Sequence, residues 1–270
     1  MNIRRLAGML IALSILLINT NTFAQESRFK YDDIGYYGDS MTKVKINGKW
    51  GYIGKNGVEI IPAVYDEIGG FGWFDNEEMA TIKRDGKMGY INRAGKEIVA
   101  PIYDLTTDFV DDRGKVMVNG KWGFVDKTGK EVVHLIYDEA QFFTGDYTAV
   151  RQNGKWGFID KNGKEIGKLI YDKIYNWGFE GDLTAVKRND KWGIMNREGI
   201  EAIPPKFRAT SQLLFVNGLA AVLPDDRWGF IDTSLREVIK PIYKEVGDFF
   251  GEIAPAKLFT KWKYIGKTGK

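Results

Sequence analysis

Carboxylates at a fixed spacing are the side chains of this sequence that could do chemistry. An aspartate directly follows a tyrosine at Asp66, Asp104, Asp138 and Asp172. A glutamate lies six residues before an aromatic residue at Glu59, Glu97, Glu131, Glu165, Glu201 and Glu237. Such groups could line one rim and cleave a glycan by acid and base catalysis. A mechanism needs one constellation at one place, however, whereas a group present in every repeat answers a need of every repeat. We therefore expect each Asp to hydrogen-bond the backbone of its own turn, and we predict that the protein is not an enzyme.

The other chemical candidates have structural explanations. His134 is the single histidine, and its counterparts in other repeats are Pro, Ala or Lys, so we expect an exposed residue at a strand end. The Asp-Lys-Asn-Gly turn at 160–163 resembles a calcium loop only superficially, because the full spacing of oxygen ligands and the closing Glu are missing. The absence of cysteine excludes a thiol nucleophile, a disulfide and a Cys-based metal site. We predict no catalytic residue, no metal and no cofactor.

The carboxylates belong to a repeat of 34 to 38 residues. Its cleanest copy is residues 153–165, Asn-Gly-Lys-Trp-Gly-Phe-Ile-Asp-Lys-Asn-Gly-Lys-Glu. The position of the Trp in this copy is occupied along the chain by Trp50, Met88, Trp122, Trp156, Trp192, Trp228 and Trp262. A fixed period in this range indicates a repeat architecture.

Each repeat is predicted to form short β-strands. The alternating segment 147–152 leads into Asn153-Gly154, a strong hairpin signal because a type I′ turn needs positive φ at both central residues. The second strand, 155–160, ends in another Gly-closed turn, and a third strand begins near Glu165. The Tyr-Asp pair then opens a fourth short segment.

Both faces of the second strand are apolar. Trp156 and Phe158 point to one face, and Gly157 and Ile159 point to the other. Other sheets must therefore lie on both sides. The glycine after the Trp suits the close approach of a neighbouring aromatic ring or backbone.

These units resemble the WG repeat, also called KWG, of bacterial envelope and secreted proteins. The resemblance covers essentially the whole chain after residue 24. It implies little about activity, because the family is defined by its repeat and not by a reaction. The chain departs from the pattern at Met88, Arg208, Leu235, Lys244 and Lys263.

The two ends of the chain complement each other. Tyr31 and Asp32 occupy the Tyr-Asp position of a repeat that lacks its Trp-containing half at the N-terminus. The matching Trp-containing half is found at the C-terminus. Lys270 is the eighth residue after the last Trp, and Gln25 would be the ninth. We therefore predict an all-β fold of about seven ~35-residue antiparallel units in a closed propeller-like ring, with the last unit completed by both termini. An open β-solenoid or superhelix is the alternative, because ~35 residues is short beside the ~40 to 45 of a propeller blade.

Two tryptophans stand outside the Trp series. Trp73 and Trp177 each lie 15 residues before the Trp position of a unit, in the longer connections 69–76 and 176–181. Loops on a rigid repeat scaffold often carry binding residues. The candidate binding residues are Trp73, Phe74, Trp177 and Phe179. The alternative is that these side chains pack under their own loops.

The N-terminus is predicted to be a secretory signal peptide, residues 1–24, followed by a single WG-repeat domain, residues 25–270. Arg4 and Arg5 precede an apolar run from Leu6 to Ile18, and a small-residue cleavage site ends at Ala24. Thirteen apolar residues are too few to span a bilayer. Without a cysteine for lipid attachment, we expect a periplasmic or secreted protein that is not lipid-anchored and has no stable membrane insertion after cleavage.

Charge excludes one class of partner. The net charge is +3, and it falls to about +1 after loss of the two N-terminal arginines, with both signs interspersed in every unit. We expect no nucleic-acid binding and a monomer. The first functional hypothesis is a non-enzymatic scaffold of the cell envelope or secreted space that binds a protein or envelope polymer. The alternative is an envelope glycan hydrolase or lyase with a dispersed carboxylate site.

Overall fold

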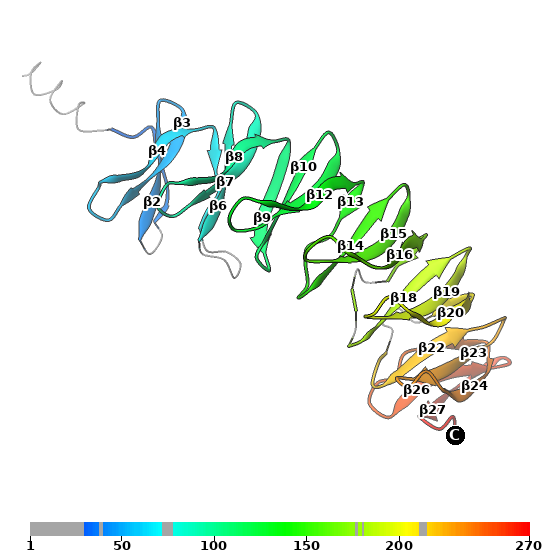
Figure 1. The fold of residues 1–270 in the computed structure, drawn as a ribbon. Coiled ribbons are helices and arrows are strands. Elements are labelled where there is room, and N and C mark those ends of the chain that lie inside the picture. The colour runs from blue at the N-terminus through cyan, green and yellow to red at the C-terminus, as the bar shows by residue number, and fades with distance from the viewer. Residues whose placement is uncertain (1–29, 38–39, 72–77, 176–177, 180, 211–214) are drawn as a thin grey trace, which may run out of the picture. The chain divides into compact units, whose positions relative to one another are not determined.

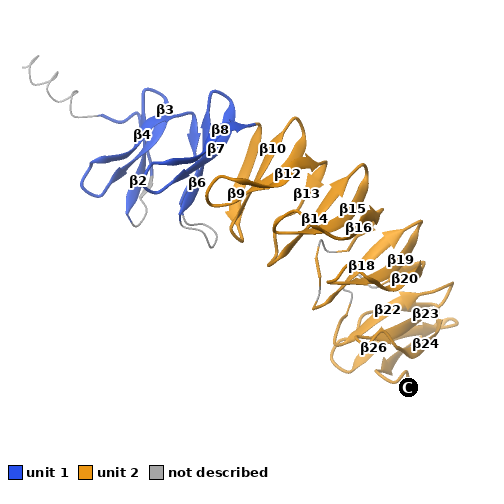
Figure 2. Cartoon of the chain, viewed as in Figure 1, with its two compact units in different colours: residues 1–103 blue, residues 104–270 orange. Residues whose placement is uncertain are grey.

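The computed structural model describes residues 30–37, 40–71, 78–175, 178–179, 181–210 and 215–270 (Figure 1). Within these ranges the chain consists of antiparallel β-sheets, and no helix occurs. The chain divides into two compact units, Met1–Tyr103 and Asp104–Lys270 (Figure 2). In the described ranges no helix is long and apolar enough to cross a membrane.

The first unit contains two four-stranded sheets in which strands follow one another in chain order. They are β1 (Asp33–Tyr37), β2 (Met41–Ile46), β3 (Lys49–Gly54) and β4 (Glu59–Tyr65), then β5 (Glu67–Ile68), β6 (Met79–Arg84), β7 (Lys87–Asn92) and β8 (Glu97–Tyr103).

The second unit contains five sheets of the same order, the last with three strands. The third and fourth sheets are β9 (Leu105–Val110), β10 (Arg113–Val118), β11 (Lys121–Val125) and β12 (Glu131–Tyr137), then β13 (Glu139–Ala140), β14 (Tyr147–Gln152), β15 (Lys155–Asp160) and β16 (Glu165–Tyr171). The fifth and sixth are β17 (Lys173–Ile174), β18 (Leu183–Arg188), β19 (Lys191–Asn196) and β20 (Glu201–Phe207), then β21 (Ala209–Thr210), β22 (Leu219–Leu223), β23 (Trp228–Asp232) and β24 (Glu237–Tyr243). The seventh is β25 (Glu245–Val246), β26 (Ile253–Leu258) and β27 (Lys261–Gly266).

The hairpin that carries the Trp forms as the sequence predicts. Asn153 and Gly154 have φ of 51° and 77°, the positive values that a type I′ turn requires. The short segment after Tyr-Asp, however, does not stay with its own unit. Lys173 of β17 pairs with Lys187 of β18, so this segment is the first strand of the next sheet. Each sheet is thus tied through the chain to the sheet before it.

The glycine after the Trp lies under a bulge in the fourth strand. Trp50 pairs with Tyr65, and Tyr52 pairs with Ile61. Two residues along β3 therefore correspond to four residues along β4. A Cβ on Gly51 would come within 2.4 Å of the Ile61 carbonyl oxygen. The predicted close approach is therefore confirmed as a contact with backbone, and a side chain larger than hydrogen cannot occupy this position without moving β4.

Within each unit the hydrophobic core lies between successive sheets. Phe158 of the fourth sheet is fully buried and packs with Val186 and Met195 of the fifth. Ile159 points to the opposite face and packs with Phe124 of the third sheet. The aromatic residue two places after the Trp thus faces the next sheet, and the aliphatic residue after it faces the previous one. The prediction that both faces are buried is confirmed for the inner sheets.

The Trp position is less deeply buried than the sequence suggested. Trp156 is 5% exposed, but its counterparts in the first, third, fifth and sixth sheets are only half-buried. In the seventh sheet Trp262 is 52% exposed and Tyr264 is 70% exposed. In the inner sheets of this unit, the equivalent positions belong to the face that packs on the next sheet. The second unit has no sheet after the seventh.

The pairing that would close a ring falls outside the described ranges. Its N-terminal strand would be residues 25–30, of which the structure describes only Lys30. The signal peptide, residues 1–24, also lies outside them. Seven units built of antiparallel sheets are observed; closure stays a prediction.

The burial of Trp156 can be tested directly. Trp156→Ala should lower the free energy of unfolding by about 3 to 5 kcal/mol, because it removes a buried aromatic side chain. Phe142→Ala, in the connection between β13 and β14, is the control and should cost less than about 1 kcal/mol, because this aromatic side chain is 45% exposed. Urea unfolding followed by circular dichroism measures both. Equal losses would contradict the proposed packing.

Candidate binding site

The recurrent aspartates connect neighbouring sheets. Asp172 follows β16, forms an ion pair with Lys155 of the fourth sheet and accepts a hydrogen bond of 2.8 Å from the backbone N–H of Asn189 in the fifth. Asp66 makes the same contacts with Lys49 and with the N–H of Asp85. The expectation that each Asp caps its own turn is therefore wrong. Because the chain crosses to the next sheet at this point, the nearest unpaired N–H groups belong to the following hairpin.

These contacts shift the titration of the carboxylates. The ion pair with Lys121 lowers the pKa of Asp138, and hydrogen bonds from the backbone N–H groups of Gly154 and Asn153 lower it further. The pKa of Asp172 is lowered in the same way by Lys155 and by the N–H of Asn189. Such carboxylates stay ionised at neutral pH and are occupied by structural partners, which makes them poor general acids.

The recurrent glutamate joins a second network. Glu201 at the start of β20 accepts a 3.0 Å hydrogen bond from the Tyr171 hydroxyl of the previous sheet. Its carboxylate also pairs with the Arg188 guanidinium, 2.8 Å away, and that guanidinium lies 5.9 Å from the centre of the Tyr171 ring. Burial and the bond to Glu201 raise the pKa of Tyr171. An arginine side chain thus lies across the junction between the fourth and fifth sheets.

The same network joins the first two sheets. The Tyr65 hydroxyl lies 2.7 Å from a carboxylate oxygen of Glu97, and the Arg84 guanidinium lies 5.6 Å from the Tyr65 ring centre. Arg84 also contacts both carboxylate oxygens of Glu97, the second at 3.2 Å. Burial and Glu97 raise the pKa of Tyr65 to about 12. Tyrosine, arginine and glutamate therefore form the same group at these two junctions, whereas Val118, Gln152 and Leu258 occupy the arginine position in other repeats.

Both networks are interrupted between the fifth and sixth sheets. The tyrosine position holds Phe207, the arginine position holds Pro224, and the Asp position holds Arg208. Arg208 donates instead to the backbone carbonyl of Asp225, 3.2 Å away. Glu237 stands in the usual glutamate position without the hydroxyl and the guanidinium that Glu97 and Glu201 receive.

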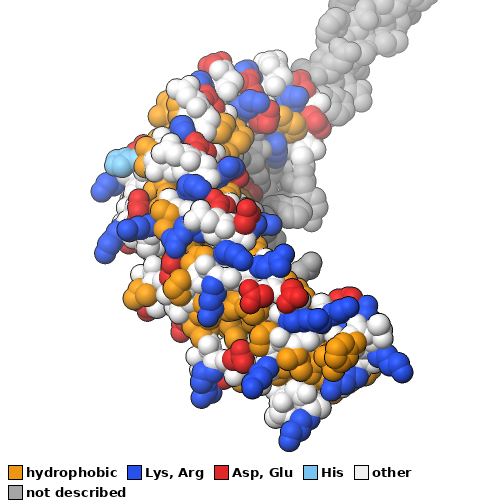
Figure 3. Space-filling model, turned by 90° about the vertical axis from the view of Figure 1, so that its right-hand side faces the viewer, with side chains coloured by type: hydrophobic (Ala, Val, Ile, Leu, Met, Phe, Trp, Pro, Cys, Tyr) orange, Lys and Arg blue, Asp and Glu red, His pale blue; other side chains and the backbone are white. Residues whose placement is uncertain are grey.

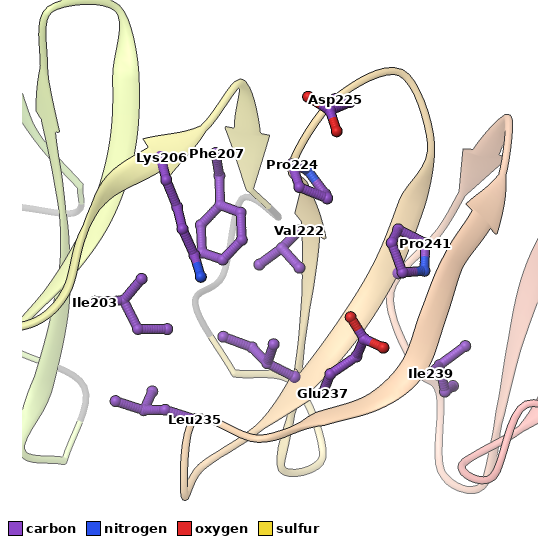
Figure 4. A pocket seen from close by; sticks show the side chains of 12 residues that line it. Ile203, Lys206, Phe207, Val222, Pro224, Asp225, Leu235, Glu237, Ile239 and Pro241 are labelled. Carbon is purple, nitrogen blue, oxygen red and sulfur yellow. The ribbon is translucent and has the colours of Figure 1, made fainter.

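A pocket of about 410 Å³ lies at this junction (Figure 4). Phe207, Val222, Pro224, Ile239 and Pro241 are among the residues that line it, together with the charged groups of Lys206, Asp225 and Glu237. The Glu237 side chain projects from β24 into the space between the strands (Figure 4). The lining therefore combines apolar side chains with one ammonium and two carboxylates.

Leu235 lies at this junction. It occupies a turn position held by glycine in the other sheets and adopts a φ of 63°, a conformation that is strained for leucine. Its side chain packs against the core cluster between the fifth and sixth sheets and also lines the pocket.

Sequence reasoning missed this pocket. The signals were present, since Arg208 and Leu235 break the repeat, but Phe207 was grouped with the tyrosines as an aromatic residue. Only the structure shows that the missing hydroxyl, the missing arginine and the added leucine meet at one place.

Most of the predicted aromatic binding residues lie outside the described ranges: Trp73, Phe74 and Trp177. Phe179 is described and packs between sheets, with its ring centre 4.8 Å from that of Phe158. Its N–H donates to the Tyr147 hydroxyl at 2.9 Å. This packing explains Phe179 structurally, and its binding role stays a prediction.

His134 lies within β12, is exposed, and its Nδ1 is 2.7 Å from Glu131. In the described parts of the chain, no three His, Asp or Glu side chains are grouped so that they could hold a metal ion. The face in Figure 3 shows basic and acidic side chains interspersed with hydrophobic ones.

The repeat pattern matches a known family model, the WG containing repeat, over residues 27–50, 50–87, 88–122, 122–156, 156–192, 192–226 and 228–262. The chain belongs to this family. The WG repeats thus cover all seven sheets. A search of curated proteins found no match.

Solved structures align with this chain only at low TM-scores. A eukaryotic initiation factor aligns over 88% of this chain and 86% of its own, with 9% identity and a TM-score of 0.36. PorZ, a surface component of the type-IX secretion system of Porphyromonas gingivalis, aligns over 89% of this chain and 36% of its own, with 12% identity and a TM-score of 0.31. Hsv2 of Kluyveromyces lactis aligns over 80% of this chain and 89% of its own, with 8% identity and a TM-score of 0.36.

The aspartate contacts predict a pH dependence. A folded-state pKa below the ordinary value of 3.8 means that Asp138 stabilises the fold above that pH and loses this contribution as the pH falls through its folded-state pKa. Asp138→Asn should therefore lower the Tm at neutral pH, and its difference from wild type should shrink in acid. Thermal unfolding between about pH 2 and pH 7 tests this. Asp146→Asn is the control, because the Asp146 side chain is 97% exposed; an equal effect there would contradict a specific role for Asp138.

Proposed function

We propose that this WG-repeat protein is a non-enzymatic scaffold of the cell envelope or secreted space that binds a protein or an envelope polymer. The observation that carries the proposal is the use of the recurrent carboxylates as connections between sheets. Asp66, Asp138 and Asp172 each bind a lysine and a backbone N–H, and Glu97 and Glu201 each bind an arginine and a tyrosine. Groups occupied in this way hold a scaffold together instead of attacking a substrate.

We place binding on the connections that depart from the repeat. Trp73, Phe74 and Trp177 stand in the longer connections, and loops on a rigid scaffold are where partners bind. Aromatic side chains there suit a glycan or a peptide, because they offer large apolar faces. The interspersed charges of Figure 3 favour such partners over nucleic acid.

We further propose that the seven units close into a propeller-like ring. The seventh sheet has three strands where the others have four, which leaves the outer edge of β27 available for residues 25–30. The exposed face of Trp262 and Tyr264 would then be covered by the first sheet. In the open β-superhelix that is the alternative, this face and this edge stay in contact with solvent.

Substitution of the off-pattern tryptophans tests the binding proposal. Trp73→Ala and Trp177→Ala should each weaken capture of a partner from an envelope fraction about tenfold or more while shifting the Tm by less than about 2 °C. Trp156→Ala is the matched control and should show the reverse pattern. Turnover of peptidoglycan or another envelope glycan that one Asp or Glu substitution abolishes would overturn the scaffold proposal.

Deletion of residues 262–270 tests closure. In a ring this cut deprives the N-terminal strand of its partner, so the Tm of the whole molecule should fall by about 10 °C or more. In an open array each unit touches only its neighbours, so the cut should shorten the array and leave the main transition in place. Circular permutation provides the control: joining 270 to 25 and opening the chain between 129 and 130 should preserve the fold only if the ends meet.

A further inference from the structure

We propose that the pocket between the fifth and sixth sheets is a binding site for a guanidinium group on an alkyl stem. The inference rests on the proposed binding function and assigns it a second surface, distinct from the Trp73 and Trp177 connections. The pocket lies wholly within the second unit, between β20 on one side and β22, β23 and β24 on the other (Figure 4).

The other junctions of this protein show what such a pocket accepts. Between the fourth and fifth sheets, the Arg188 side chain lies on the Tyr171 ring and its guanidinium pairs with both carboxylate oxygens of Glu201, at 2.8 and 3.1 Å. Between the first and second sheets, Arg84 lies on Tyr65 and pairs with Glu97. Two junctions thus place an arginine in the same position between an aromatic ring and a glutamate.

The junction that holds the pocket keeps two of these three parts. Phe207 supplies the aromatic ring and Glu237 supplies the carboxylate, and both line the pocket. The arginine is replaced by Pro224, whose short side chain lines the pocket wall. Val118 and Gln152 also occupy the arginine position of the repeat, so Pro224 is one of several replacements. What distinguishes this junction is the pocket, which has an aromatic ring and a carboxylate at the positions of Tyr171 and Glu201. An arginine side chain from another molecule would find there the contacts that Arg188 makes within the chain.

Size and charge agree with this assignment. About 410 Å³ lies within the roughly 300 to 1,000 Å³ of small-molecule sites and exceeds the space of one arginine side chain. The charged lining residues are Asp225, Glu237 and Lys206, which sum to one net negative charge. Apolar residues such as Val222 and Ile239 would cover the alkyl stem, while the carboxylate would accept paired N–H bonds from the planar guanidinium.

Lys206 is the competing cation. Its ammonium lies 5.2 Å from the centre of the Phe207 ring, on which a ligand guanidinium would also lie. Other sheets have Val or Ile at the position of Lys206. The fourth and sixth sheets, for example, have Ile170 and Ile242 there. Removal of the Lys206 charge should therefore strengthen binding of a cationic ligand.

Titration with agmatine tests the site. Isothermal calorimetry on the full chain should give saturable 1:1 binding, and Glu237→Gln should weaken it about tenfold or more through loss of the charge-assisted pair. Glu252→Gln removes the same charge from a side chain that is 81% exposed and should leave the affinity unchanged. Putrescine, which has the same four-carbon stem and the same charge but an ammonium in place of the guanidinium, should bind more weakly than agmatine. No saturable binding, an unchanged affinity in Glu237→Gln, or equal affinity for putrescine would each overturn the proposal.

Restoring the missing arginine gives an independent test. Pro224→Arg should fill the pocket from within, raise the Tm and abolish agmatine binding, whereas agmatine binding at wild-type affinity would overturn the proposal. If Pro224→Arg does not fold, Leu235→Gly serves instead, because it removes a side chain that lines the pocket and should weaken binding. Lys206→Met should increase the affinity.

Two sources of the ligand can be separated. A blocked Ala-Arg-Ala peptide that binds at least as well as agmatine would indicate an arginine side chain of a partner protein, whereas binding of agmatine alone would indicate a free small molecule. Either result supports the site. If the protein binds no agmatine but still captures a partner in a way that depends on Trp73, the scaffold function stands and only this inference is overturned.

Discussion

The inner sheets of this protein depend on burial of two apolar faces. A four-stranded sheet with Phe158 on one side and Ile159 on the other cannot be stable alone, because either face would expose aromatic or aliphatic surface to water. Each sheet is therefore stabilised by its neighbours, and the core is a series of similar layers. This constraint explains why the motif repeats with so little variation around the Trp.

Polar contacts fix the relative position of the packed sheets. Apolar layers can slide, whereas an aspartate that bridges a lysine of one sheet and an N–H of the next fixes their relative position. The glutamate network does the same on another part of the junction. Such surface-exposed pairs contribute little stability singly, so their main effect is geometric. Both contacts are absent between the fifth and sixth sheets, where apolar packing joins the layers and a pocket lies beside it.

Much of the fold could be predicted from the sequence, because period, hairpin turns and apolar alternation are local properties. Asn153-Gly154 and Gly157 were understood correctly for this reason. The partners of Asp138 and Asp172 were not, because the sequence cannot show that the chain changes sheet directly after the tyrosine. The pocket was missed for a related reason: Phe207, Pro224 and Leu235 are far enough apart in sequence that only packing brings their separate departures together.

The bulge in the fourth strand affects how the edge of each sheet can pair with other strands. In each four-stranded sheet the strand after the Gly-closed turn is an edge, and unprotected edges recruit strands from other molecules. Here the bulge opposite the Trp interrupts regular pairing, and prolines at Pro62, Pro101, Pro204, Pro205 and Pro241 remove donors from the same strands. An incoming strand would meet a distorted edge with gaps in its hydrogen-bonding groups. The bulge and the prolines therefore disfavour pairing of these edges with strands of other molecules.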